Sequence, residues 1–429
     1  MSPKRTAPEQ SLAALVDIYC RRVTPAVLEQ HRGASVSSPL GIWLLLAACS
    51  TAAVGPEREQ LEDALGCSAF EAASLLAQVL ETPPPALHSA LALWVRSRDR
   101  TTALVEWSAG LPRSVERGPI PSQADADAWA DERTSGLIQR FPVEITDLTR
   151  LILASALATK VGWQRPFEIV PAAGQLRASS PWSGRVEHVL VDREPALPLV
   201  LAHTDAAGVV AVHFAVSDEE LAVVSIAADP DVDRHGAFEA AYEIGRRCRT
   251  DALTEARCSL FDLALGQGHS WEIVEEEVAS YEAGDRSESI VSATLVDWSV
   301  DSRLDLQRSD RFGVAPALAA LVRLIGPDPR GDRFDAVQSA VASYTSTGFE
   351  AAAISTLGLF GAAFRNPQER GLLRTARLFF DHPYAAVALA GRPSDFTRRR
   401  AGHTELFGLP LFSAWVAEPR EPEPVDQGR

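Results

Sequence analysis

The chain has 429 residues, of which 46% are hydrophobic and 23% are charged. These values are typical of a folded globular protein with a large core, and they exclude a disordered chain or a small disulfide-stabilised scaffold. The 57 acidic residues outnumber the 41 basic residues, which gives a formal net charge of −16. Because an acidic chain repels phosphate groups, proteins or small molecules are the expected partners, and nucleic acid and anionic membranes are not.

The N-terminal segment does not resemble a secretory signal peptide, because no apolar stretch follows Lys4 and Arg5. The longest apolar stretch, residues 40–53, is shorter than the roughly 20 residues that a membrane-spanning helix needs. The sequence therefore predicts a cytoplasmic protein with no membrane partner. The five cysteines have no C-x-x-C spacing, so neither a zinc site nor a disulfide framework is predicted.

The beginning of the chain is predicted to be helical. Apolar residues at helical spacing predict helices over residues 11–28, from Pro39 onward, over 57–65 and over 70–81. A strand over residues 87–95 and a helix over 124–141 follow. The run 148–161 is apolar on both faces, which predicts a central strand that is covered on both sides.

The later part of the chain is richer in predicted strands. Short apolar segments bounded by turn residues predict strands over residues 186–191, 208–214, 221–226, 291–300, 336–344, 376–380, 384–389 and 411–416. Helices gathered early and strands gathered late favour an α+β fold. The charged stretches 271–289 and 394–404 are interpreted as tolerated insertions with solvated faces.

The sequence contains none of the common enzyme motifs. It has no G-x-S-x-G, H-E-x-x-H, P-loop or G-x-G-x-x-G pattern. His382 lies between two apolar segments, but no serine elbow accompanies it, so we interpret it as a structural histidine. The chain is therefore not predicted to be an enzyme, and no metal or cofactor is predicted. Residues 345–363 stand out because they are rich in Ala, Gly, Ser and Thr and have no basic residue.

Several motifs, in chain order, resemble the serpin family, whose members are mostly suicide inhibitors of serine and cysteine proteases. Residues 38–42 (SPLGI) resemble the family's S-P-x-S-I, and residues 153–163 (LASALATKVGW) resemble its L-V-N-A-I-Y-F-K-G-x-W. Residues 381–384 (DHPY) resemble D-H-P-F, and residues 411–419 (LFSAWVAEP) resemble L-F-x-G-R-V-x-x-P. The resemblance extends from about residue 12 to residue 419.

The resemblance implies the serpin fold, with three β-sheets, eight or nine helices and an exposed reactive loop at about residues 345–375. It implies a single domain over residues 11–419, between an N-terminal tail (1–10) and a disordered tail (420–429). A target serine or cysteine protease would cleave the loop, and the cut loop would insert into the large sheet. The alternative is a non-inhibitory serpin with a binding, storage or chaperone-like role. A monomer is expected; loop–sheet polymerisation and an extracellular location stay open.

The family's hinge, E-E-G-T-E-A-A-A-A-T, corresponds to residues 346–355 of this chain. The implied hinge residues are Gly348, Phe349, Glu350, Ala351, Ala352, Ala353 and Ser355. If Phe349 begins the inward-facing register, residues 351, 353, 355, 357 and 359 follow it inward. Phe349 stands where the family usually has Thr or Ser, and overpacking costs about 1–3 kcal/mol, so slower insertion is expected. Family spacing places the scissile bond at Ala362–Ala363, with the bonds 364–365 and 365–366 as alternatives.

Four residues correspond to the region that controls opening of the sheet in serpins: Ser38, Ser155, Trp163 and Gln338. Ser38 and Trp163 match the family. Ser155 and Gln338, together with Gly41, replace the family's Asn, His and Ser. A hydrogen bond between Ser155 and Gln338 would substitute for part of the original cluster.

Overall fold

The computed structural model describes residues 11–193, 201–250, 252–280, 284–328, 335–349, 369–391 and 406–422. Within these residues lie nine α-helices: α1 (Leu12–Gln30), α2 (Pro39–Ser50), α3 (Pro56–Leu65), α4 (Ala69–Glu81), α5 (Thr102–Ala109), α6 (Gln123–Arg133), α7 (Arg234–Arg249), α8 (Leu253–Ala256) and α9 (Val314–Ile325). None of these described helices is both long and apolar enough to cross a membrane.

The predicted helices of the first 85 residues are confirmed. Ser11, Ser38 and Ser68 cap α1, α2 and α4 by accepting a hydrogen bond from the backbone N–H three residues later. The helix predicted over residues 124–141 is too long, because α6 ends at Arg133. Ser135 follows with a positive φ of 54°, which turns the chain away from a helical path. The helices α7 and α9 are absent from the prediction, so helices also occur late in the chain.

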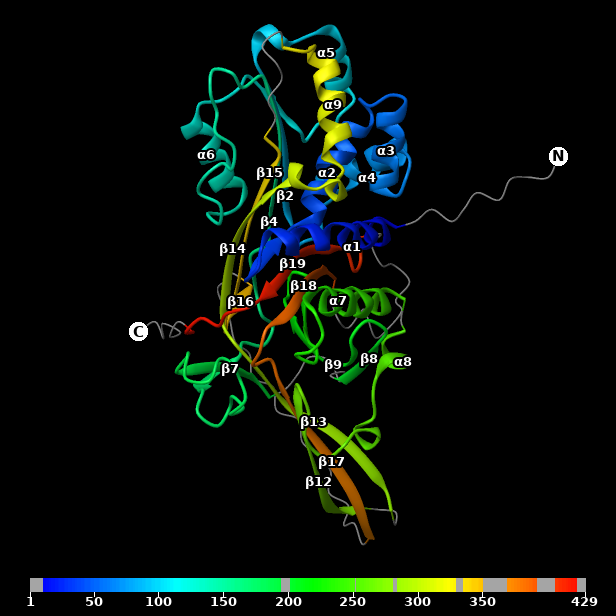
Figure 1. Ribbon diagram of the computed structural model, residues 1–429, viewed down its shortest axis with the longest axis vertical. Coiled ribbons are helices and arrows are strands. Elements are labelled where there is room, and N and C mark those ends of the chain that lie inside the picture. The colour runs from blue at the N-terminus through cyan, green and yellow to red at the C-terminus, as the bar shows by residue number, and fades with distance from the viewer. Residues whose placement is uncertain are drawn as a thin grey trace, which may run out of the picture.

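A six-stranded sheet forms the centre of the molecule. Its order is β1 (Ser35–Ser37), β19 (Pro410–Val416), β18 (Tyr384–Ala390), β10 (Leu221–Ala227), β9 (Gly208–Val216) and β8 (Leu201–Thr204). Every residue of β10, β18 and β19 is buried. The helices α1 and α7 lie against this sheet and against each other (Figure 1). This part of the structure supplies most of the rigid core.

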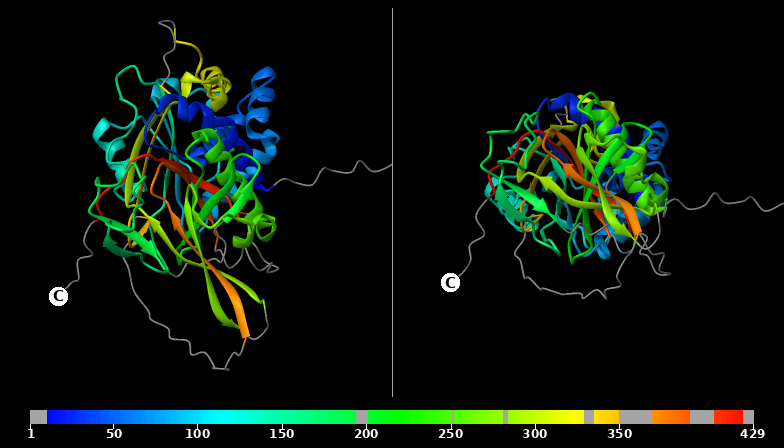
Figure 2. Two further views of the ribbon diagram at one scale, coloured as in Figure 1. Left: turned by 60° about the horizontal axis from the view of Figure 1, so that its bottom comes forward. Right: turned by 90° about the horizontal axis from the view of Figure 1, so that it is seen from below.

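A second six-stranded sheet extends away from the body. Its order is β11 (Gly266–Gln267), β12 (Trp271–Ser280), β17 (Glu369–Phe379), β13 (Arg286–Leu295), β7 (His188–Asp192) and β6 (Glu168–Pro171). The ends of β12, β17 and β13 project from the body as a blade, which we define by these three strands (Figures 1 and 2). The interpretation of residues 271–289 as an insertion is therefore wrong, because they form all of β12 and the start of β13, but Glu276 and Glu277 are exposed as expected.

Two strand predictions also need correction around this blade. The strand predicted over residues 376–380 begins at Glu369, because β12 pairs with it along its whole length, from Trp271–Leu378 to Ser280–Glu369. The single strand predicted over residues 291–300 is two strands. It breaks at residues 296–297 between β13 and β14 (Trp298–Asp305), which belong to different sheets.

The remaining strands form a large sheet that is divided lengthwise. One half is β3 (Glu116–Gly118), β2 (His88–Val95) and β4 (Leu151–Ala158), and the other half is β14 with β15 (Val337–Tyr344). A short pair, β5 (Val161–Gly162) with β16 (Gly348–Phe349), joins the halves at one end. The run 148–161 is therefore not a central strand covered on both sides as predicted, because β4 forms the edge of its half and its alternate residues from Leu151 to Leu157 are only partly buried.

A buried ion pair fixes the chain where β17 ends. The side chain of Asp381 is inaccessible to solvent and accepts hydrogen bonds from the Nε (2.9 Å) and the backbone N–H (3.2 Å) of Arg177. Arg177 also donates to the carbonyl oxygens of Gly268 and His269, just before β12. Three distant segments thus meet at one guanidinium group. His382 Nε2 lies 2.9 Å from the carbonyl oxygen of Ala228, which fits its structural interpretation.

Candidate functional site

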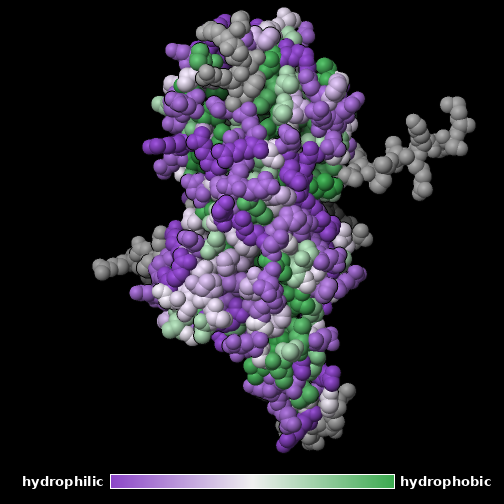
Figure 3. Space-filling view, viewed as in Figure 1, coloured by the Kyte–Doolittle hydropathy of each residue, from purple (hydrophilic) through white to green (hydrophobic). Residues whose placement is uncertain are grey.

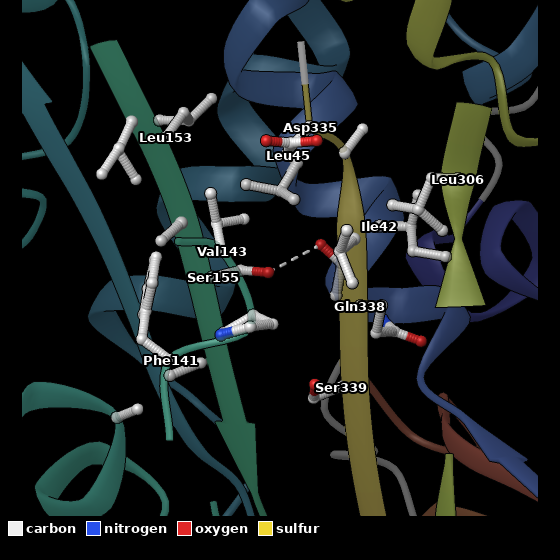
Figure 4. Close-up of a pocket in the computed structure, with 18 of the residues that line it drawn as sticks. Ile42, Leu45, Phe141, Val143, Leu153, Ser155, Leu306, Asp335, Gln338 and Ser339 are labelled. Atoms are coloured by element: carbon white, nitrogen blue, oxygen red, sulfur yellow. Dashed lines mark hydrogen bonds between the residues drawn. The ribbon is translucent and has the colours of Figure 1, made fainter. Parts of the chain in front are cut away.

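The most unusual feature of the fold is the open gap between β4 and β15. Among the described residues, β4 is paired as a strand only with β2 and β15 only with β14. A cavity of about 790 Å³ lies between them. It is lined by α2, α9, the two strands and the segment that follows α6 (Figure 4). Each strand therefore presents an unpaired backbone edge to the same space, which is where an additional strand could pair.

The direction of the two strands decides how an added strand would run. After Thr159 and Lys160, β4 leads into β5, and β15 leads through the turn at residues 345–347 into β16. Since β5 and β16 pair with each other, β4 and β15 both run toward this end of the gap. A strand that continued from β16 back along the gap would be antiparallel to both neighbours.

The segment after α6 covers the gap from the side opposite α2. Phe141 packs with Trp94 and Trp129 in a small separate core beneath α6. Figure 4 shows Phe141 and Val143 lying over β4 beside the gap. Arg303 of β14 donates a 2.9 Å hydrogen bond to the carbonyl oxygen of Pro142. This exposed hydrogen bond is a weak link between β14 and the segment after α6.

Trp163 closes the gap at the end where β5 and β16 pair. Its backbone N–H donates to the carbonyl oxygen of Thr347 (2.9 Å), and its indole Nε1 donates to that of Thr345 (3.0 Å). The backbone N–H of Phe167 donates to the carbonyl oxygen of Ser346 (2.8 Å). These hydrogen bonds hold residues 345–347 in place, so the start of the implied hinge is well anchored.

Phe349, the last described residue of the hinge, is already buried. The residue is only 5% exposed, and its ring centre lies 6.5 Å from that of Trp163 and 6.3 Å from that of Trp298. Tyr344 stacks on Trp298 in the same cluster. The ring of Phe349 is already accommodated in the structure. Insertion would therefore not add the expected cost of overpacking at this residue. The aromatic residues that accommodate it come from three separate segments, which the sequence pattern did not connect.

The structure brings three of the four predicted sheet-opening residues to the N-terminus of α2. The amide of Gln338 bonds both backbone groups of Ser38: Oε1 accepts from its N–H (3.0 Å), and Nε2 donates to its carbonyl (2.8 Å). The hydroxyl of Ser155 donates to the carbonyl oxygen of Gly41 (3.1 Å; Figure 4). The expected Ser155–Gln338 hydrogen bond is absent between these described residues. Each edge of the gap is instead tied separately to α2, and Trp163 lies apart at the closed end.

This arrangement predicts the effect of Gly41→Ser. A Cβ atom at residue 41 would lie 3.4 Å from Gln338 Nε2 and 3.5 Å from Ser155 Oγ, so a hydroxyl there would link the two edges. Leu157, the closest neighbour at 3.3 Å, lines the cavity and has room to move. We expect chemical denaturation to show a gain of about 1 kcal/mol in unfolding free energy relative to Gly41→Ala. Because serine is the poorer helix former by about 0.5 kcal/mol, a Gly41→Ser variant that is less stable than Gly41→Ala by that amount would contradict the link.

The other predicted site residues lie outside the described residues. These are the hinge residues Glu350, Ala351, Ala352, Ala353 and Ser355 and the scissile residues Ala362 and Ala363. Their roles stay predictions. Sequence reasoning missed the covering segment 141–149, although Pro142 is a signal that a helix could not continue there.

Comparisons with known proteins identify the class of fold. The structure of human glycosylated kallistatin aligns with a TM-score of 0.62 and 13% identity, over 97% of this chain and all of that one. Serpin48 of the insect Tenebrio molitor aligns with a TM-score of 0.58 and 15% identity, over 95% and 98% of the two chains. Human thyroxine-binding globulin, in complex with its hormone, aligns with a TM-score of 0.60 and 12% identity, over 96% and 100%. The chain therefore has the serpin fold.

The sequence supports the same family. The family model of the serpins, serine protease inhibitors, matches residues 19–171. A search of curated proteins finds no match. The matched part of the sequence and the overall fold are thus both similar to those of serpins. Because the same fold occurs in a thyroxine-binding protein, the fold alone does not decide between protease inhibition and ligand binding.

Proposed function

We propose that this protein inhibits a serine-type endopeptidase as a suicide substrate, through cleavage of the segment that follows Phe349 and its insertion between β4 and β15. The observation that carries the proposal is the β5–β16 pair. Gly348 lies opposite Gly162 and Phe349 opposite Val161, in antiparallel register, at the end of an open gap. Gly348 and Phe349 would thus be the first two residues of an inserted strand, and the chain that follows them would have an unfilled space to enter.

The register of this pair extends in a way that suits insertion. Continued along β4 in an inserted strand, it would bring residue 353 opposite Leu157, residue 355 opposite Ser155 and residue 357 opposite Leu153. Directly opposite residues of an antiparallel pair share one face, and Ser155 faces α2, since its hydroxyl bonds Gly41. The residues on that face would be Ala351, Ala353, Ser355, Leu357 and Leu359, all small or apolar. Glu350 would lie opposite Lys160, a favourable cross-strand charge pair.

The energy for trapping a protease would come from the two unpaired strand edges. A dozen new backbone hydrogen bonds, at a net of about 1 kcal/mol each, provide a driving force on the order of 10 kcal/mol. On the other side of the cut, β17 is paired with both β12 and β13, so it stays in its sheet. Only the part of the loop before the cut can then move, and it would carry the covalently attached protease with it.

A non-inhibitory role in binding is the second candidate. The observation that favours it is the packing of Phe349 against Trp163 and Trp298. These contacts would hold the start of the hinge in its present position and oppose insertion. In this case the loop would be cut without insertion. The described residues contain no group of metal-ligating side chains that would indicate a different kind of site.

A panel of elastase-like, subtilisin-like and trypsin-like proteases tests the proposal. We expect a band on a denaturing gel at the summed mass of protein and protease, and a cut mapped to residues 359–366. Small residues at Ala362–Ala363 favour an elastase-like enzyme, whereas a cut at Arg365–Asn366 would point to a trypsin-like target. Cleavage without any covalent band for every protease would favour the non-inhibitory alternative, and cuts only outside residues 359–366 would contradict the assigned bond.

A further inference from the structure

The blade is the part of the described structure that continues directly from the segment 350–368. Its central strand, β17, begins at Glu369, and Glu369 pairs with Ser280 at the far end of β12. Figures 1 and 2 show this end projecting from the body of the molecule. A protein bound to the C-terminal part of that segment is therefore held close to the blade.

One face of the blade is covered by the chain itself. Arg374 of β17 donates to the carbonyl oxygens of Leu260 (2.7 Å) and Leu263 (3.1 Å). The ring of Phe261 packs against the guanidinium groups of Arg374 and Arg286, at 4.7 Å and 5.1 Å from their Cζ atoms. Residues 260–263 thus cover this face, and it is not available to a partner.

The opposite face is open. The pairing of the strands places Val274, Glu276 and Val278 of β12 on one face with Leu373 and Thr375 of β17. Val274 is 44% exposed, and Val291, on the neighbouring strand β13, is 43% exposed. Figure 3 shows hydrophobic surface along the blade. Glu276 is exposed between the two valines of β12, and it has no ion-pair partner among the described residues, whereas Glu275 and Glu277 pair with arginines of β17.

We propose that this open face is an exosite, a surface that contacts the target protease outside the protease's own active site. The inference rests on the proposed function and names the surface that selects its partner. Glu369 lies six residues after the predicted scissile Ala363, and the chain between them spans at most about 21 Å. A protease domain of about 200 residues is about 40 Å across, so a protease engaged at that bond reaches the blade.

The chemistry of the face indicates what it selects. The valines and Leu373 would be buried most favourably against apolar residues of the partner protease. Glu276, which lies between the valines of β12, would be stabilised by a basic residue of the partner. The preferred protease is therefore one that carries an apolar patch with a lysine or arginine beside its active-site cleft. Charge attraction by Glu276 would speed the encounter, and this contribution would weaken as salt screens it.

The test compares the rate of loop cleavage in variants of the full chain. The variant Val274→Glu with Val291→Glu changes two exposed positions of the blade. The matched control is Val105→Glu, which is 47% exposed on α5 at the opposite end of the molecule (Figure 1). For the fastest protease of the panel, we expect the blade variant to lower the second-order rate of cleavage within residues 350–368 at least tenfold. The control should leave the rate unchanged, and equal melting temperatures would show that both variants are folded.

A second variant, at Glu276, tests the exosite without changing the valines. Glu276→Lys should slow cleavage severalfold at low salt and less at high salt. Rates within twofold of wild type for both blade variants, with every protease of the panel, would overturn the exosite. The exosite would also be overturned if the wild-type protein formed a concentration-dependent dimer that dissociates in the Val274→Glu, Val291→Glu variant. The face would then bind a second copy of the chain. The covalent band on the same gels tests suicide inhibition, whereas the cleavage rate tests the exosite. A covalent band with a rate that does not depend on the blade would overturn the exosite alone.

Discussion

Replacing Ala353 with arginine is expected to abolish the covalent complex while leaving loop cleavage intact. If an inserted strand kept the register of the β5–β16 pair, residue 353 would lie opposite Leu157, on the face toward α2. Insertion would bury an unpaired guanidinium group there, which costs several kcal/mol out of a driving force of about 10 kcal/mol. Slow insertion gives the acyl-enzyme time to hydrolyse. The protein should therefore become a substrate, as a denaturing gel would show by a cut chain with no covalent band.

The matched control for this prediction is Gln368→Arg. Residue 368 lies on the other side of every candidate scissile bond and directly before β17. The same added charge should therefore leave the covalent band and its yield unchanged. A covalent band of undiminished yield for Ala353→Arg would contradict the register and, with it, the proposed path of insertion.

Replacing Arg177 with alanine is expected to lower the free energy of unfolding by about 3–5 kcal/mol at neutral pH. The change leaves the carboxylate of Asp381 buried without its partner and removes the hydrogen bonds to Gly268 and His269. Chemical denaturation measures the loss. The control is Arg370→Ala, which breaks a pair with Glu277 whose side chains are 84% and 64% exposed. That exposed pair should contribute no more than about 1 kcal/mol.

The same ion pair predicts a pH dependence. Burial by itself would raise the pKa of Asp381, but the hydrogen bonds and charge of Arg177 outweigh it and lower the pKa to about 2. A carboxyl group with a lowered pKa stabilises the fold above its unfolded value of about 3.9, and this stabilisation is lost as the pH falls toward 2. In Arg177→Ala burial raises this pKa instead, so the difference between wild type and the variant should shrink steadily as the pH falls from the raised pKa of the variant toward 2. A difference that stays constant down to pH 2 would contradict this assignment.

Local patterns in the sequence were sufficient for the helices but not for the edges of the sheets. Serine caps and helical spacing identify α1 to α4, because these signals lie within a few residues of one another. The apolar run around β4 predicts burial on both faces, but the face that carries Leu151, Leu153 and Leu157 is only partly buried. Burial of the faces carries no information about backbone partners at the edges, so the gap beside β4 could not be seen. Its existence depends on β15, more than 170 residues later in the chain.

The blade shows why the charged stretch 271–289 could not be identified as strands from the sequence. Glu275 and Glu277 look like a solvated run, yet they pair with Arg374 (2.8 Å) and Arg370 (2.9 Å), which lie 99 and 93 residues away. Similarly, the resemblance named Ser38, Ser155 and Gln338 correctly as neighbours, but not their hydrogen bonds, which run to the backbone of α2. Side-chain types indicated the location, whereas the partners depended on the tertiary arrangement.

Thermal unfolding before and after cleavage of the segment 350–368 tests the central claim most directly. An elastase-like protease makes the cut, and the same mixture is run on a denaturing gel. Insertion into the gap predicts a large rise in melting temperature for the cut protein together with a covalent band. A cut protein that melts at the temperature of the intact one, with no covalent band, would contradict insertion and leave a non-inhibitory serpin fold.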